Sequence, residues 1–197
     1  MAARERDAAV AAAMRLRVAG SPAPVVSVGS TPTALFADDL AGVTEVRAGV
    51  YMFQDLVMAG LGVCAVDDIA ISVLVTVIGH QPEKGWLITD GGWMALSRDR
   101  GTAALAVDQG YGLVCDADGL VIADLVMTGA NQEHGIIARR DGAPWDMGAY
   151  PVGARLRILP NHACATAAQY DGYYMMVGGA LTGEYWARFN GFSSRGS

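Results

Sequence analysis

A histidine and a cysteine, His162 and Cys164, lie two positions apart in the segment "PNHACAT", residues 160–166. If the chain is extended after the bend at Pro160 and Asn161, the two side chains point to the same side. An imidazole and a thiolate are both good zinc ligands, and the thiolate favours zinc over magnesium or manganese. Two protein ligands suit a catalytic ion whose other positions go to water or substrate.

Two other interpretations of this pair remain open. A buried cysteine beside a hydrogen-bonded histidine would belong to the core, because cysteine is often simply buried. A Cys–His nucleophile pair would need the imidazole to reach the sulfur, and no oxyanion-hole sequence accompanies it. The residues alone therefore leave metal binding, packing and nucleophilic chemistry as alternatives.

A second polar segment, "GSTPT" at residues 29–33, could bind a phosphate group. Gly29 allows the backbone to approach a phosphate closely, and Ser30 and Thr31 supply hydroxyl groups. Pro32 fits the first turn of a helix. Ordinary capping of a helix by Ser or Thr explains the same pattern.

The elements that must position these residues change in character along the chain. Helices are predicted over residues 8–18 and 34–40, and strands over 25–28 and 43–53. This order is typical of a parallel α/β sheet or barrel. Two such units cannot close a barrel, so residues 1–68 are interpreted as a barrel remnant. Its open sheet edge implies that this part packs on the β domain, or that its remaining strands come from another chain or have been lost.

From Ile69 onward the sequence consists of short β-type runs that end at Gly, Asp or Pro. The runs are "ISVLVTVIG", "GWLITDGG", "YGLVCDADG", "LVIADLVMTG", "HGIIARRDG", "ARLRILP" and "GYYMMVGG". Their spacing predicts a mainly antiparallel β-barrel or sandwich over residues 69–197. The expected fold class is therefore α+β overall, with an α/β barrel remnant followed by a β domain.

Composition argues against several classes of protein. The chain is 52% hydrophobic and 17% charged, which is enough apolar surface for a substantial core. The net charge of −6 and the absence of a basic patch argue against nucleic-acid binding. No apolar run is long enough to span a membrane, and the N-terminus lacks the apolar centre of a secretory signal. Three scattered cysteines suit a reducing cytoplasm.

The chain contains a single lysine, Lys84, in the segment "HQPEKGW". Pro82 and Gly85 flank this lysine, so we expect it in an exposed turn. Cys64 and Cys115 lie in apolar runs, and we expect both to be chemically inert.

Five segments carry a resemblance to a known family. "VVSVGSTPT", "VTEVRAGVYMFQD", "DGGWMALSRDRG", "NQEHG" and "LPNHACATAAQYDGYYMM" occur in the order seen in the D-threonine aldolase and D-serine dehydratase family. These are pyridoxal-phosphate enzymes with an alanine-racemase-like barrel and a C-terminal β domain. From about Ala8 to Phe192, the chain resembles the second half of such an enzyme.

The resemblance implies site residues and ligands. His162 and Cys164 would bind zinc or another divalent metal, and His-x-Cys at this position resembles the dehydratases more than the aldolases. The substrate would be a small β-hydroxy-D-amino acid, such as D-serine, D-threonine or 3-hydroxy-D-aspartate. Arg47 would either approach the cofactor ring or lie on the surface. The residues that would hold the cofactor phosphate are Gly29, Ser30, Thr31, Gly49 and Val50.

The lysine count limits the activity that the resemblance implies. Enzymes of this family bind pyridoxal phosphate as a Schiff base with a lysine at the end of an early barrel strand. Lys84 lies beyond the barrel motifs, so no catalytic residue is assigned and the chain alone is expected to be inactive. It would need the missing N-terminal half or a homo-oligomer partner. The alternative is a non-catalytic β-domain protein that binds a metal or a partner.

Overall fold

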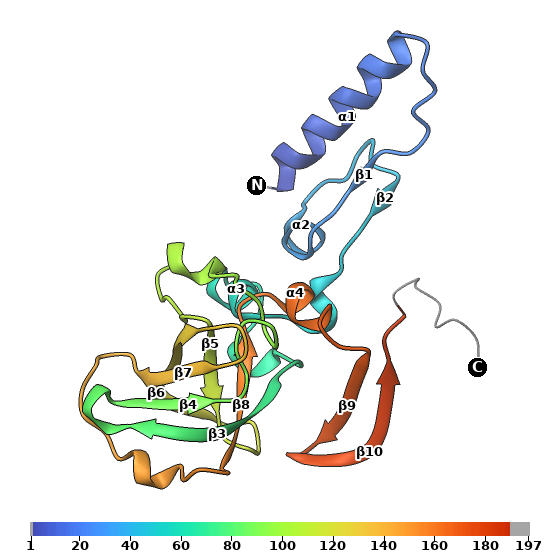
Figure 1. Cartoon of the computed structure of the whole chain (residues 1–197). Coiled ribbons are helices and arrows are strands. Elements are labelled where there is room, and N and C mark those ends of the chain that lie inside the picture. Colours follow the sequence, from blue (N-terminus) through green and yellow to red (C-terminus); the bar gives the residue numbers. More distant parts are fainter. Residues whose placement is uncertain (1, 190–197) are drawn as a thin grey trace.

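The computed structural model describes residues 2–189, which form an N-terminal α/β unit, a closed β-barrel and a β-hairpin (Figure 1). The N-terminal unit stands away from the barrel, and two short helices, α3 (Leu56–Gly60) and α4 (Ala163–Ala167), lie where the three parts meet. Among the described residues, no helix combines the length and the apolar character needed to cross a membrane.

The N-terminal unit follows the order helix, strand, helix, strand. It consists of α1 (Ala2–Val18), β1 (Ser27–Val28), α2 (Thr31–Phe36) and β2 (Glu45–Val46). β1 and β2 pair in parallel and form a sheet of two strands. The mixed α/β character predicted for this part is therefore observed.

The strand predicted over residues 43–53 is wrong beyond Val46. The chain continues instead into a 3₁₀ helix, η1 (Val50–Met52), whose N-cap is Gly49. The physical reason lies in β1, which ends before Gly29, where the chain turns toward α2. β2 consequently has no partner strand along which its ladder could continue.

Six antiparallel strands close into a barrel in the order β3-β4-β7-β6-β5-β8, which confirms the predicted antiparallel β-barrel in an α+β chain. The strands are β3 (Val73–Gln81), β4 (Trp86–Thr89), β5 (Gly112–Cys115), β6 (Val121–Ala130), β7 (Gly135–Arg139) and β8 (Arg155–Pro160). Each corresponds to one of the β-type runs in the sequence. Closure leaves the barrel without an exposed sheet edge.

Alternation along the strands builds the barrel core. In β3, Val73, Val75 and Val77 are buried, while Leu74 between them is 56% exposed. This period of two is the one expected when one face of a strand points into a core. The core cluster comprises Val73, Val75, Val77, Leu87, Leu96, Val114, Leu125, Met127, Ile137, Leu156 and Ile158.

A hairpin of β9 (Gly172–Val177) and β10 (Ala180–Ala187) forms a separate antiparallel sheet of two strands. β9 was predicted, whereas β10 was not. In β10 the ladder is irregular between Leu181 and Tyr185, and Gly183 has a left-handed backbone (φ +81°). Such a bulge interrupts the alternation that identifies a strand in a sequence.

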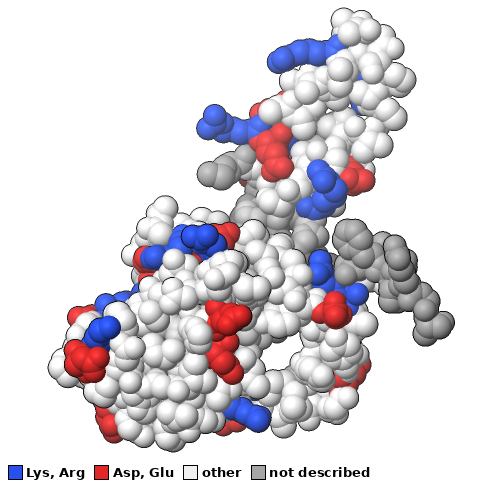
Figure 2. Space-filling model, in the orientation of Figure 1, with Lys and Arg blue, Asp and Glu red and all other residues white. Residues whose placement is uncertain are grey.

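Charged residues of both signs are distributed over the molecule. On the face drawn in Figure 2, Lys and Arg lie next to Asp and Glu on the barrel and on the N-terminal unit, rather than in separate fields. The same view shows a gap between the barrel and the hairpin.

The single lysine lies where the sequence predicts it. Lys84 ends the 3₁₀ helix η3 (Pro82–Lys84), which connects β3 to β4, and it is exposed. Gly85 follows with a left-handed backbone (φ +66°), and the Lys84 ammonium group lies 4.8 Å from the centre of the Trp86 ring. This turn belongs to the barrel and not to the α/β unit.

Candidate metal and cofactor site

His162 and Cys164 lie at the start of α4, directly after β8. His162 is the N-cap of this helix and Cys164 is in its first turn. The expectation of an extended chain, with both side chains on one face of a strand, is therefore wrong. There are two physical reasons: the alanine-rich segment "ACATA" favours a helix, and the backbone N–H of Ala163 finds a partner far away in the sequence, outside the strand ladder.

That partner is Asp55, a buried residue that caps two helices. Its Oδ1 accepts a hydrogen bond of 2.9 Å from the backbone N–H of Met58, as the N-cap of α3. Its Oδ2 accepts one of 2.9 Å from the backbone N–H of Ala163, the first residue of α4. One carboxylate thus satisfies N–H groups at the ends of two helices that are distant in sequence.

The ring of His162 is bound on one side by Asp99. The distance between Nδ1 and the Asp99 Oδ2 is 2.7 Å. The histidine side chain is 44% exposed and the aspartate side chain 39% exposed, so both remain accessible from solvent. Among the described residues, Nε2 of His162 has no hydrogen-bond partner. A histidine held through one ring nitrogen keeps its other nitrogen available to a ligand.

Cys164 is exposed, so the interpretation as a buried core cysteine is wrong. Cys115, by contrast, is buried, and burial together with the nearby charge of Asp116 raises the pKa of its thiol to about 11. Burial also raises the pKa of the Cys64 thiol. Within residues 2–189, no hydrogen bond joins His162 to Cys164, which leaves the nucleophile-pair interpretation without support.

Metal binding by the side chains at the start of α4 stays a prediction. Within the part of the chain that the structure describes, no group of three or more His, Cys, Asp or Glu side chains is arranged to hold a metal. His162 and Cys164 would supply two ligands of different type, an imidazole nitrogen and a thiolate. The remaining positions would be open to water or substrate.

A cleft of about 240 Å³ lies beside this turn. It brings together His162 and Val50, which the sequence places in two different candidate sites. The cleft is lined by Val50, Asp55, Val57, Met58, Asp99, Gly101 and His162. A predicted metal ligand and a predicted phosphate-binding residue thus line the same cavity.

Of the other predicted phosphate-binding residues, Thr31 contacts the residue that follows Val50. The Oγ of Ser30 accepts a hydrogen bond of 3.1 Å from the backbone N–H of Thr33. Ser30 is therefore the N-cap of α2, as expected if this segment caps a helix. The buried hydroxyl of Thr31 accepts a hydrogen bond of 3.0 Å from the N–H of Tyr51, directly after Val50. The two predicted loops therefore meet, while phosphate binding itself stays a prediction.

Gly29 is needed where the two loops approach each other. A Cβ at this position would lie 2.5 Å from the carbonyl oxygen of Arg47. The N–H of Gly29 donates a hydrogen bond of 3.0 Å to Oε1 of Glu5 in α1. The other Glu5 oxygen accepts from the hydroxyl of Thr33. Bonds from the Thr33 hydroxyl and the Gly29 amide lower the pKa of the Glu5 carboxyl.

Arg47 lies on the surface, with a side chain that is 70% exposed. Its Nε donates a hydrogen bond of 2.7 Å to the Oγ of Ser27, and it pairs with Glu45 at 3.3 Å. These contacts fit the surface interpretation of Arg47.

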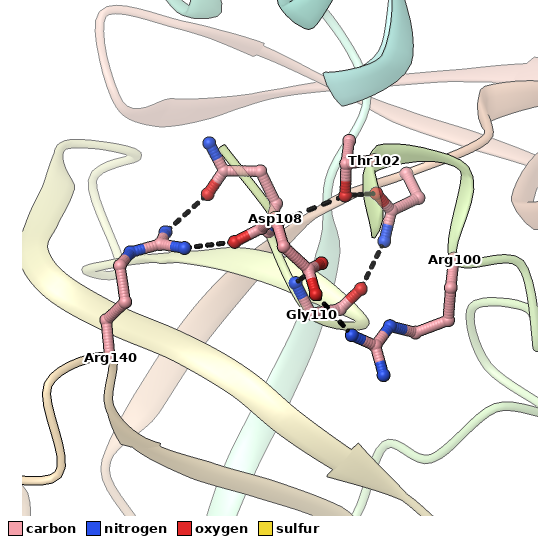
Figure 3. A network of polar contacts seen from close by, with 7 residues as sticks. Arg100, Thr102, Asp108, Gly110 and Arg140 are labelled. Atoms are coloured by element: carbon pink, nitrogen blue, oxygen red, sulfur yellow. Dashed lines mark hydrogen bonds and ion pairs between the residues drawn. The ribbon is translucent and has the colours of Figure 1, made fainter. Parts of the chain in front are cut away.

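A buried polar network holds the residue that precedes His162 (Figure 3). The hydroxyl of Thr102 donates a hydrogen bond of 2.7 Å to Oδ1 of Asn161, and Nδ2 of Asn161 donates one of 2.7 Å to the carbonyl of Gly110. Arg100 pairs with Asp108 at 2.5 Å across the same loop. The loop that carries Asp99 is thereby fixed to the end of β8.

The sequence pattern predicts His162 and Cys164, and the family resemblance predicts Val50, but both miss Asp55 and Asp99. Asp55 had a usable signal, since an aspartate before the apolar run "LVMAG" is typical of an N-cap. Asp99 stands in the polar segment "SRDRG" and has no comparable signal.

Comparison with known proteins gives the family. A family model described as "Putative serine dehydratase domain" matches residues 70–176, which include the whole barrel and the turn with His162 and Cys164. The chain belongs to this family. The resemblance to the D-serine dehydratase and D-threonine aldolase family is thus confirmed.

Individual members of the serine dehydratase family are similar over most of the chain. The D-threo-3-hydroxyaspartate dehydratase of Delftia sp. (strain HT23) is 60% identical over 194 residues, which are 98% of this chain and 51% of the relative. The D-serine dehydratase of Dictyostelium discoideum is 33% identical over 169 residues, 82% of this chain and 42% of the relative. The chain spans about half the length of the curated relatives it matches.

The fold agrees with that of a solved family member. The structure of the Delftia D-threo-3-hydroxyaspartate dehydratase superposes on this chain with a TM-score of 0.85 at 60% identity. The superposed region covers 97% of this chain and 51% of the Delftia chain. Two further solved structures of that protein are of variants. In one a histidine is replaced by alanine, and in the other, which is in the metal-free form, a cysteine is replaced by alanine. The two replaced residues are separated by one position, as His162 and Cys164 are.

Proposed function

We propose that this chain is the metal-binding part of a pyridoxal-phosphate-dependent lyase that acts on a small β-hydroxy-D-amino acid. The reaction would be the dehydration of D-serine or 3-hydroxy-D-aspartate, or the aldol cleavage of D-threonine. The observation that carries the proposal is the cleft in which His162 and Val50 lie together.

His162 and Cys164 would hold a divalent metal, with zinc as the expected ion. Nδ1 of His162 is hydrogen-bonded to the accepting carboxylate of Asp99, which leaves Nε2 free, and the thiol of Cys164 is exposed. A metal-free form has been described for a cysteine variant of the 60% identical relative, which supports a metal site in the family. A metal bound here would polarise the β-hydroxyl group of the substrate.

The cofactor phosphate would bind where the loops at residues 29–31 and 49–50 meet. Gly49 leaves open space around its backbone, and the position of Val50 at the cleft supports this assignment. The N–H of Gly29 is bonded to Glu5, so phosphate binding there requires the Glu5 side chain to move. Bound pyridoxal phosphate would supply a ring that withdraws electrons from the substrate.

The chain would depend on a second polypeptide for the reaction. Its single lysine lies in the exposed β3–β4 turn, and the parallel sheet of β1 and β2 has two strands. The remaining barrel strands and the cofactor lysine would come from an N-terminal half or from an oligomer partner. A metal-binding protein without catalysis is the second candidate, favoured by the position of Lys84.

Zinc binding tests the metal assignment directly. Calorimetric titration of the metal-depleted chain should give about one zinc ion per chain. The double variant His162→Ala, Cys164→Ala should lose this binding, whereas the matched pair His80→Ala, Cys64→Ala should keep it. Equal zinc binding by the wild type and the first variant would refute the assignment.

Adding the other half of the enzyme separates the two candidate functions. The N-terminal half of the Delftia relative, produced as a separate chain, offers a suitable partner because its second half is 60% identical to this chain. Turnover of a β-hydroxy-D-amino acid by the mixture, lost in His162→Ala, would support the lyase. Zinc binding without turnover, despite a stable complex of the two chains, would support the second candidate.

A further inference from the structure

Asp99 and His162 form a contact whose role is not explained by a contribution to the stability of the fold. Both side chains are more than one-third exposed, at 39% and 44%, and an exposed polar contact of this kind contributes little to folding. The contact is nevertheless short, at 2.7 Å between Nδ1 and Oδ2, and it joins two segments that are 63 positions apart.

Several neighbouring bonds hold the two segments in a fixed relationship. Thr102 follows Asp99 in the same loop, and its hydroxyl binds Asn161, which directly precedes His162, through a buried bond of 2.7 Å. On the other side of His162, the N–H of Ala163 is bound to the buried Asp55. The histidine backbone is therefore held on both sides, and the remaining freedom is rotation of its side chain.

The carboxylate of Asp99 limits that rotation and selects one form of the ring. An ionised carboxylate can only accept hydrogen bonds, so the neutral ring must carry its proton on Nδ1. Nε2 then has a free lone pair, which is the form that binds a metal. In a free imidazole no such selection exists, and both nitrogens compete for the proton.

We infer that Asp99 is a positioning residue, which fixes the orientation and the protonated nitrogen of His162 so that Nε2 is ready to bind a divalent metal. The inference rests on the proposed function, in which His162 is a metal ligand. Asp99 itself would not touch the metal, and its effect would pass through the imidazole ring. Residues that hydrogen-bond a metal-binding histidine commonly change the metal affinity of the site by about 10- to 100-fold.

Nitrogen NMR of the histidine rings tests the orientation without any metal. The chain has three histidines, so the ring signals can be assigned with His162→Ala, while His80 and His134 report on correct folding. At pH 8 the wild type should show His162 protonated on Nδ1. Asp99→Ala should shift the proton toward Nε2, and Asp99→Asn should keep part of the Nδ1 form, because an amide oxygen can still accept the bond.

Zinc titration of the same proteins provides the second measurement. Asp99→Ala should weaken zinc binding about 10- to 100-fold. Asp118→Ala, an exposed aspartate in the β5–β6 turn, makes the same change in charge and should leave both measurements unchanged. Equal ring protonation in the wild type and Asp99→Ala, or equal zinc affinity, would overturn the inference. A wild type that binds no zinc would instead overturn the proposed function.

Discussion

Asp55 and Ala163 are joined by a hydrogen bond of 2.9 Å, although 108 positions separate them in the sequence. The same carboxylate binds the N–H of Met58, so it fixes α3 and α4 to each other at their N-termini. Since α4 carries Cys164 and begins next to His162, this one side chain connects the candidate metal-binding turn to the loop after η1.

Asp55→Ala should lower the free energy of unfolding by about 2 kcal/mol, because two helix caps are lost from a buried position. Urea unfolding followed by circular dichroism measures this change. Asp38→Ala removes an exposed aspartate of equal charge and should change the stability by less than about 0.5 kcal/mol. Equal midpoints for the two variants would contradict the capping role.

Thr102→Val should destabilise the loop between β4 and β5. The valine has nearly the same shape but leaves Oδ1 of Asn161 and the N–H of Gln109 without the Thr102 hydroxyl, at a cost of about 1–3 kcal/mol. Thr102→Ser keeps the hydroxyl and should retain most of the stability. Thermal unfolding distinguishes these outcomes, and a serine variant as unstable as the valine variant would argue for packing rather than hydrogen bonding.

The three cysteines should differ strongly in reactivity. At pH 8 iodoacetamide should modify the exposed Cys164 fastest. Cys115 should react slowest, because it is buried and a pKa of about 11 leaves its thiol almost entirely protonated. Mass spectrometry of the digested protein measures the rates. Zinc should protect Cys164 selectively, and an unchanged Cys164 rate in saturating zinc would count against its role as a ligand.

The contact between α1 and α2 should weaken in acid. The pKa of Glu5 is lowered from its ordinary value of 4.5 by the Thr33 hydroxyl and the Gly29 amide. A carboxyl group with a lower pKa in the folded state stabilises that state above the ordinary pKa, and this contribution is lost as the pH falls through the folded pKa. Hydrogen exchange in α1 should therefore show constant protection from pH 7 to 5 and a loss of protection below pH 4.5.

Glu5→Gln is the control for this pH dependence. Its amide cannot titrate, so its protection should not change over the acid range in which that of the wild type declines. Parallel declines in both proteins would assign the effect to another group.

The chain alone should show no D-serine dehydratase or D-threonine aldolase turnover, even with added pyridoxal phosphate. The reason is the location of its single lysine in the exposed β3–β4 turn. Assays for pyruvate and acetaldehyde measure the two reactions. Lys84→Ala should behave like the wild type, and turnover that disappears in this variant would identify Lys84 as catalytic.

The barrel could be predicted from the sequence because its signals are local. Each strand from β3 to β9 corresponds to a β-type run, and turns such as the one after Lys84 are marked by Pro and Gly. α4 cannot be predicted from the local pattern, because its start depends on a bond to Asp55, and the pattern around His162 also fits an extended chain. The strand proposed over residues 43–53 failed for a similar reason, since its length depends on where β1 ends.

The site was predictable only in part. The types and spacing of His162 and Cys164 identify them as candidate ligands, but Asp99 reaches His162 from 63 positions away. The position of Val50 on the same cleft likewise follows from the packing of η1 against the start of α4, and not from any local pattern.

A protease that cleaves only after lysine has one bond to cut in this chain, the bond between Lys84 and Gly85. The cut would separate β3 from β4 covalently, but β3 would keep its pairing with β8, and β4 its pairing with β7. The two fragments would therefore stay associated as a nicked barrel, with the candidate phosphate-binding loops on one fragment and the candidate metal ligands on the other. Cleavage at this one lysine would thus place the two parts of the candidate site on different polypeptides.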